Sequence, residues 1–358
     1  MCQNAIHGFL AALPKCEHHM HLEGSLSPEL LFELSARNKV ALPSPETEDP
    51  AFASVETLYE RYRNFTSLDD FLHYYYIGFT VLLHESDFEA LAYAYFTRAA
   101  SEGVRHAEVF FDPQVHIDRG IAYETMVNGF TSARRRAEAD LGITSLLVPC
   151  LLRHLPVPAS LACFTTMREA GHFRDGTLAG LGLCSTEKDR PPHMWEEVYG
   201  LAAKEGIRLT AHAGEEGPAA YISEALDTLA VTRIDHGVNA RLDEGVMERL
   251  ASQRTMLSVC PLSNVVLRVV TKVAEVPIRT FLDKGVPFSI NSDDPAYFGG
   301  YILDNYCAVQ DAFGLSVAEW RTIARNAVEG SWCTEERKEV IFAEIDKVIA
   351  EWEPKITA

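Results

Sequence analysis

Short apolar runs alternate with amphipathic helical stretches along most of the chain. Seven such runs follow one another from the first third of the chain onward, at residues 106–111, 145–152, 178–183, 208–212, 233–237, 256–260 and 287–290. Between them, residues 123–140, 194–205 and 244–252 have the spacing of helices with one apolar face. Strands that are apolar on both faces and alternate with helices predict a parallel sheet.

An eighth strand is predicted near the N-terminus, over residues 17–24. Eight strand–helix units favour an α/β fold of the closed (β/α)₈ (TIM) barrel type. An open doubly wound sheet is the alternative, but no Gly-x-Gly-x-x-Gly follows a strand, so nothing supports a dinucleotide site. We predict one barrel domain over residues 1–358, with a helical insertion at about 28–103 and outer helices from residue 303 onward.

Composition and charge narrow the class of protein. The 358 residues are 47% hydrophobic and 23% charged, which is typical of a globular protein, and the net charge is −19. Such an acidic chain disfavours nucleic acid as a partner, and no segment is long and apolar enough to suggest a membrane span. The eight cysteines never form Cys-x-x-Cys, and the first seven residues do not resemble a secretion signal. We expect a cytoplasmic protein, with nuclear entry and homodimer formation left open.

A His-x-His pair stands out in the first predicted strand. Because side chains on a strand alternate between faces, His19 and His21 should point the same way and His18 the other way. The pair alone is a weak signal. Further polar clusters, however, end the later strands, at residues 185–187, 212–215, 235–237, 261–264 and 291–294. In a barrel these ends meet at one mouth, where active sites lie.

Three histidines and one aspartate in these clusters make a candidate metal site. His19, His21, His212 and Asp293 offer three imidazoles and one carboxylate, a set that suits one Zn²⁺ with a place left for water. Water on such an ion is acidified toward neutral pH. A second metal is not expected, because residues 178–183 carry no lysine or other bridging ligand.

Three further polar residues lie beside these ligands. His236 is placed to accept or hold a proton of the water, and Glu215 is placed to act as an acid if a dry pocket keeps it protonated. Asp294 adjoins Asp293 but must point elsewhere, so it is free to bind a substrate. The alternatives are that His236 is a core histidine and that Asp294 caps the segment beginning at Pro295.

Four motifs resemble the adenosine/adenine deaminase family of the amidohydrolase superfamily. They are residues 19–24 (His-Met-His-Leu-Glu-Gly), 212–215 (His-Ala-Gly-Glu), 234–237 (Ile-Asp-His-Gly) and 292–295 (Ser-Asp-Asp-Pro). The resemblance is strongest to the branch that acts on free adenine and yields hypoxanthine and ammonia. It implies that Glu215 donates to purine N1, that His236 and Asp293 handle the water proton, and that Asp294 recognises N7. It also assigns Gly214 to substrate binding.

Two residues bear on the choice of substrate within this family. Glu187 stands where adenosine deaminases usually have glycine, and its carboxylate would bind the N9–H that only a free base has. Glu23 stands where they tend to have aspartate, which fits a pocket rebuilt around the missing ribose. One departure is Cys184, where adenine deaminases tend to have aspartate, and this substitution is expected to weaken activity or change the substrate.

Two alternative functions follow. The first is deamination of adenosine, of an N6-substituted adenine or of AMP. The second is a catalytically inactive barrel that binds a ligand. The helices at about residues 55–83 are placed to close the pocket in any of these cases.

Overall fold

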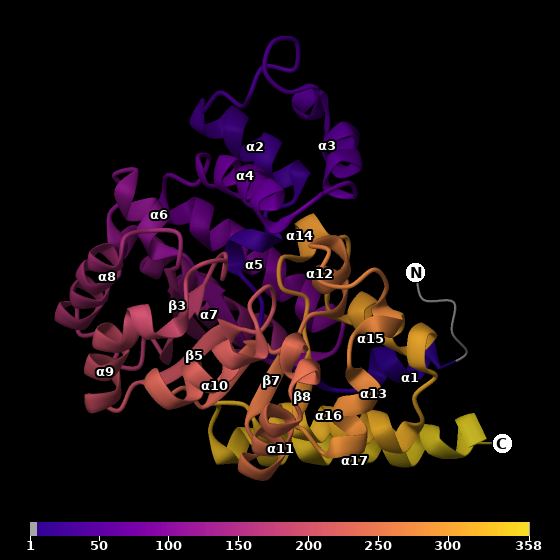
Figure 1. The fold of residues 1–358 in the computed structure, drawn as a ribbon. Helices are drawn as coiled ribbons and strands as arrows, with labels where there is room; N and C mark the ends of the chain where they lie inside the picture. Colours follow the sequence, from indigo (N-terminus) through magenta and orange to yellow (C-terminus); the bar gives the residue numbers. More distant parts are fainter. Residues whose placement is uncertain (1–5, 358) are drawn as a thin grey trace.

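All eight strands of the computed structural model run parallel in one sheet, in the order in which they occur along the chain (Figure 1). The structure describes residues 6–357. The strands are β1 (Lys15–Glu17), β2 (Val104–Phe111), β3 (Thr144–Leu152), β4 (Gly180–Cys184), β5 (Arg208–Ala213), β6 (Arg233–His236), β7 (Met256–Val259) and β8 (Phe288–Ile290). Helices connect successive strands, so the predicted TIM barrel is confirmed.

The barrel closes between the residues that follow β8 and those that follow β1. The Asp293 N–H donates to His19 O at 3.0 Å, and the His21 N–H donates to Asp293 O at 2.9 Å. On the other side of this segment, the Phe110 N–H donates to Met20 O at 2.8 Å. Two of the predicted metal-ligating segments therefore form the closing seam of the barrel.

The first strand is shorter than the sequence predicts. After β1, Met20 and His21 form only single parallel bridges, to Asp293 and Phe110. A 3₁₀ helix, η1 (Leu22–Ser25), then takes the place of the predicted strand end. The reason is that His18 and His19 join no ladder and so separate β1 from the bridges at residues 20–21.

Three helices between β1 and β2 form a cap over the end of the barrel at which the strands end (Figure 1). They are α2 (Pro28–Asn38), α3 (Val55–Tyr62) and α4 (Leu68–Phe79), with a 3₁₀ turn η2 (Pro50–Ala53) before α3. Helix α4 begins at Leu68, because Ser67 Oγ accepts the Asp70 N–H at 3.1 Å and so caps the helix. The cap lies against η1, α6 (Pro113–Asp118) and α14 (Pro295–Phe298), which surround the barrel mouth.

The next helix, α5 (Glu85–Ser101), belongs to the outer layer of the barrel rather than to the cap. It packs along α7 (Tyr123–Leu141) and against β2. The two helices approach closely at Gly129, where a Cβ would lie 2.4 Å from Glu85 O. The inserted part therefore comprises α2–α4 and is narrower than the predicted range of 28–103.

The remaining helices complete the outer layer and the C-terminal part. They are α1 (His7–Ala12), α6 (Pro113–Asp118), α8 (Val157–Glu169), η3 (Pro192–Trp195), α9 (Glu196–Lys204), α10 (Ala219–Thr228), η4 (Val238–Leu242), α11 (Glu244–Gln253), α12 (Pro261–Val266), η5 (Val273–Glu275), α13 (Ile278–Lys284), α14 (Pro295–Phe298), α15 (Ile302–Phe313), α16 (Val317–Glu329) and α17 (Glu335–Thr357). Helix α16 packs on β8 and β1, and α17 packs on α16 (Figure 1). The C-terminal helices thus lie outside the barrel, as expected.

The barrel interior also holds a buried ion pair away from the mouth. Arg233 Nη1, at the start of β6, lies 2.5 Å from Glu108 Oε2, and both side chains are buried. The Trp332 N–H donates to the other carboxylate oxygen of Glu108.

Within residues 6–357, no helix is both long and apolar enough to cross a membrane, and no disulfide joins the cysteines.

Candidate active site

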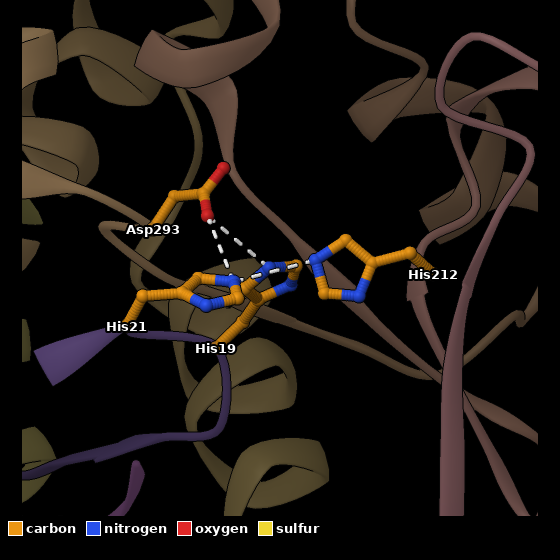
Figure 2. Close-up of side chains that lie close together, drawn as sticks. All are labelled: His19, His21, His212 and Asp293. Carbon is orange, nitrogen blue, oxygen red and sulfur yellow. Dashed lines mark hydrogen bonds and ion pairs between the residues drawn. The ribbon is translucent and has the colours of Figure 1, made fainter. Parts of the chain in front are cut away.

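The four side chains predicted as metal ligands meet at the barrel mouth (Figure 2). Asp293 Oδ1 lies 3.2 Å from His19 Nε2 and 3.6 Å from His21 Nε2. His21 Nε2 lies 3.4 Å from His212 Nε2. All four residues are buried, and their ligand atoms lie within 4.8 Å of one another. His18 turns away, as predicted, and its ring contacts Ser289 and Ser331.

Strained backbone holds part of this group in place. Asp293 has φ +64° and His236 has φ +63°, in the left-handed region that residues other than glycine rarely occupy. The two hydrogen bonds that join Asp293 to His19 and His21 fix the first of these conformations. Such strain persists only where surrounding structure imposes it, and it is concentrated at functional sites.

A carboxylate that the sequence analysis did not single out orients two of the ligands. Asp235 Oδ2 lies 3.6 Å from His212 Nδ1, and Asp235 Oδ1 accepts the Ser258 hydroxyl at 2.9 Å. Ser258 in turn lies against His19 Nδ1, with its Oγ at 3.0 Å and its carbonyl O at 3.3 Å. Because a carbonyl only accepts, His19 carries its proton on Nδ1, and the Nε2 lone pair faces the cluster.

The predicted acid and the predicted proton acceptor lie beside the ligand group. His236 Nε2 is 3.4 Å from Glu215 Oε2 and 3.7 Å from Asp293 Oδ2. Burial raises the pKa of Glu215 well above its ordinary value, and the negative charges of Asp293 and Glu187 add to this shift. Burial also lowers the pKa of His236 well below its ordinary value. At neutral pH the pair therefore consists of a protonated carboxyl group and a neutral imidazole.

Glu187 is buried, but its carboxylate serves the protein backbone. Its Oε2 accepts the Gly214 N–H at 2.9 Å, and its Oε1 accepts the Glu215 N–H at 2.8 Å. Neither Glu187 nor Gly214 is among the residues that line the pocket beside the ligand group. The structure thus brings Glu187 under the loop that carries Glu215, and its contact with a substrate stays a prediction.

Asp294 lines the pocket beside the ligand group. It precedes α14 but its side chain makes no capping hydrogen bond, so the capping alternative does not hold. Burial raises its pKa well above the ordinary value, and the negative charge of Asp293 adds to this. Gly24 lies directly behind it: a Cβ there would be 2.1 Å from Asp294 Oδ1, so only glycine fits. Glu23 is fully buried and holds the Asp112 N–H and the His116 ring.

The pocket lies between the ligand group and the cap. Its walls include His21, His212, Glu215, His236, Asp293 and Asp294 from the barrel, Asp112, Leu152, Cys184 and Ser185 from β2–β4, Leu267, and Leu68, Phe71, Leu72, Tyr75 and Tyr76 from α4. The aromatic residues Phe71, Tyr75 and Tyr76 of α4 thus form part of the pocket wall. Asp112 was missed in the sequence, although it follows β2 as the other polar residues follow their strands.

The family model for adenosine deaminase matches residues 14–348. The chain belongs to the adenosine deaminase family. One relative in this family, the adenine deaminase of Aspergillus oryzae, is 57% identical over 346 residues, which cover 97% of each chain. The crystal structure of adenine deaminase from Arthrobacter aurescens is 43% identical with a TM-score of 0.89, and the match covers 94% of this chain and 99% of that chain.

The ligand group of this adenosine deaminase family member has the chemistry and spacing that zinc requires. Ligand atoms that share one Zn²⁺ at about 2.0–2.1 Å lie roughly 3–4 Å from their neighbours, and the separations found here are 3.2, 3.4 and 3.6 Å. A similar structure, an amidohydrolase from Burkholderia ambifaria, was solved with bound Zn; it is 25% identical, with a TM-score of 0.87 over 99% of this chain and 97% of that chain. The residues present therefore fit a zinc ion.

Proposed function

We propose that this protein hydrolyses adenine to hypoxanthine and ammonia. In this reaction a water oxygen bonds to C6, the C6–N6 bond breaks, and the amine leaves as ammonia. Relatives of more than half identity over nearly the whole chain carry the name adenine deaminase, which supports the proposal. The observation that carries it is the buried Glu215 beside the four-ligand group, where burial raises its pKa and so favours the protonated form. An aromatic amine resists attack by water, and it needs both an acid on the ring and an activated water.

In this proposal His19, His21, His212 and Asp293 hold one Zn²⁺ per chain. When bound, the ion supplies Lewis acidity that lowers the pKa of water toward neutrality. The protein's part is to keep the ligands in the correct protonation state. Ser258 holds the His19 proton on Nδ1, which leaves Nε2 free to bind a metal.

The proton transfers are assigned to three side chains. The Glu215 carboxyl donates to purine N1, which withdraws electrons from C6. His236 is neutral, and its Nε2 faces Asp293 Oδ2 at 3.7 Å. Burial would raise the pKa of Asp293, but the surrounding histidine rings, that of His19 above all, lower it well below its ordinary value, so Asp293 stays ionised. His236 and Asp293 therefore hold the proton that the attacking water gives up.

The purine itself is held by the acidic side chains of the pocket. The raised pKa of Asp294 makes it a carboxyl group that donates to N7, which is an acceptor in adenine. We assign Glu23, Gly214 and Glu187 to shaping this binding site. Each of them contacts a residue that lines the pocket or the loop that carries it.

The test is the release of ammonia by purified, zinc-loaded protein from adenine, adenosine and N6-methyl-AMP. We expect turnover of adenine, and Glu215→Gln should lower kcat about 10²–10⁴-fold without losing zinc. The neighbouring exposed Glu216→Gln is the matched control and should stay within about threefold. Turnover of adenosine or N6-methyl-AMP in place of adenine would overturn the substrate assignment. Binding of adenine without turnover of any substrate, or absence of zinc by elemental analysis, would favour the inactive barrel.

The reaction is assigned to the cytoplasm or nucleus, without nucleic acid or membrane as a partner. The support is the net charge of −19 and cysteines that form no disulfide within residues 6–357. Fractionation of cells that express a tagged chain would check the location.

A further inference from the structure

Asp112 supplies a further carboxyl group to the pocket, and one of its oxygens lies within 4.8 Å of a His21 ring nitrogen and of Cys184 Sγ. It follows β2, which stands opposite β6 in the eight-stranded ring, and His236 ends β6. Asp112 is only 2% exposed and lines the pocket. Its side chain does not cap α6, the helix that it precedes. The carboxyl group therefore has no evident role in local structure.

The surroundings of Asp112 hold its carboxyl group in place. The Cys184 thiol donates to Asp112 Oδ1 at 3.5 Å. Glu23 Oε1 accepts both the Asp112 N–H and a ring nitrogen of His116, each at 3.1 Å, and so fixes the backbone. Among residues 6–357 no group donates to Asp112 Oδ2, which is left for a ligand in the pocket. The site is thus pre-formed and has one unused acceptor.

The chemistry of adenine supplies a group for this acceptor. With C6 at the ligand group and N1 at Glu215, the edge formed by N3 and N9 lies on the other side of the purine ring system, and the pocket residues left to meet it include Asp112 and Cys184. A free base carries a hydrogen on N9, whereas a nucleoside carries its sugar there. A carboxyl oxygen accepts the N9–H in either protonation state. A sugar would instead meet the buried carboxyl group.

We propose that Asp112 is the residue that selects the free base, by accepting the N9–H of adenine through Oδ2. This inference rests on the proposed function and names a residue that determines its specificity. From the sequence, Glu187 is expected to accept the N9–H. Both Glu187 oxygens already accept backbone N–H groups, so we assign this role to Asp112 instead. Cys184 acts through Asp112: its thiol occupies Oδ1 and so presents Oδ2 to the pocket.

The test compares adenine with 9-methyladenine, which differs only in the hydrogen on N9. We expect the holoenzyme to prefer adenine in kcat/KM by more than about 100-fold, since a site built around a hydrogen bond rejects an analogue that lacks it. Asp112→Ser can still begin a helix and is expected to fold. It should lower kcat/KM for adenine about 10- to 100-fold and leave that for 9-methyladenine equal or higher. Asp112→Asn keeps an acceptor oxygen and should recover most of the preference.

Asp118→Ser, at the exposed end of the same helix, is the control and should not change the ratio. An Asp112→Ser variant that keeps the preference, or that loses both substrates equally, would overturn the role of Asp112. If the wild-type protein released no ammonia from adenine, the proposed function would fail separately. The same comparison would then be made by calorimetric binding of the two bases, and equal affinities would overturn the inference.

Discussion

Replacing Asp235 with asparagine changes the partners of two proposed metal ligands, His19 and His212, at once. Asp235 Oδ1 accepts the Ser258 hydroxyl at 2.9 Å, and Oδ2 accepts the Thr210 hydroxyl at 2.8 Å and faces His212 Nδ1 at 3.6 Å. An amide has one acceptor oxygen, so one hydroxyl must turn away. If Ser258 turns, its proton points at His19 Nδ1 and pushes the ring proton onto Nε2, the atom that must bind the metal.

The size of the effect follows from these contacts. Loss of an outer hydrogen bond to a metal ligand lowers metal affinity about 10- to 100-fold, or about 1.4–2.8 kcal/mol. The contact to His212 is long, at 3.6 Å, and the Ser258 carbonyl remains 3.3 Å from His19 Nδ1. Both facts limit the loss. We therefore expect Asp235→Asn to weaken zinc binding about 10- to 30-fold, near the lower end of that range.

The assay is competition for zinc between the apoprotein and a chromogenic chelator. Asp227→Asn is the matched control, because Asp227 is exposed and pairs with Arg249 at the surface, and the zinc affinity of this variant should equal that of the wild type. Thermal unfolding in excess chelator checks that both variants fold. A correctly folded Asp235→Asn protein whose zinc affinity is within twofold of the wild type would refute the reasoning.

Three further predictions concern the acid, its support and the barrel interior. Since burial raises the pKa of Glu215, kcat/KM should persist at neutral pH and fall only as the pH rises through that raised value; a fall near the ordinary glutamate pKa of about 4.3 would contradict the assignment. Glu187→Gln places a donor against a backbone N–H and removes a negative charge, so kcat should drop about 10- to 100-fold and the alkaline fall should move to lower pH, with zinc content unchanged. Arg233→Met leaves the buried Glu108 carboxylate without its cationic partner and should lower the free energy of unfolding, measured in urea, by about 3–5 kcal/mol. Arg249→Met at the surface should lower this free energy by less than about 1 kcal/mol.

The barrel was predictable because apolar runs mark strands that are buried on both faces. The run at 256–260 becomes β7 (Met256–Val259), and the run at 106–111 becomes the end of β2 (Val104–Phe111). The extent of the first strand was not predictable, because it depends on hydrogen bonds to Phe110 and Asp293, which lie far along the chain. Local pattern carries no information on such pairing.

The candidate ligands were predictable for a related reason: each stands at the end of an apolar strand. The supporting role of Asp235 and Ser258 was not predictable, although each is a polar residue within such a strand. They are register partners of each other, and Asp235 is also the partner of His212. A polar residue inside a barrel needs a partner, but only the register identifies it.

The direction of the Glu187 side chain could not be predicted from the sequence, for a different reason. Its place after β4 correctly put it near the barrel mouth, but the direction of its side chain depends on the neighbouring loop. Gly214, with φ +73°, turns that loop so that two successive N–H groups face the carboxylate. A carboxylate accepts equally well from a substrate N–H and from backbone N–H groups, so only the structure shows which of these Glu187 binds.

The buried acids of the pocket have a common physical reason. Burial raises the pKa of Glu215, Asp294 and Asp112 well above ordinary values, with neighbouring carboxylates adding to each shift. A charged carboxylate accepts only, but a neutral carboxyl group offers one donor and one acceptor. The edges of adenine alternate between acceptor nitrogens and N–H groups, so neutral carboxyl groups match them better than ions or amines do. Crowding acids in a dry pocket costs stability in the free protein, and it is what creates the neutral groups that such a ligand requires.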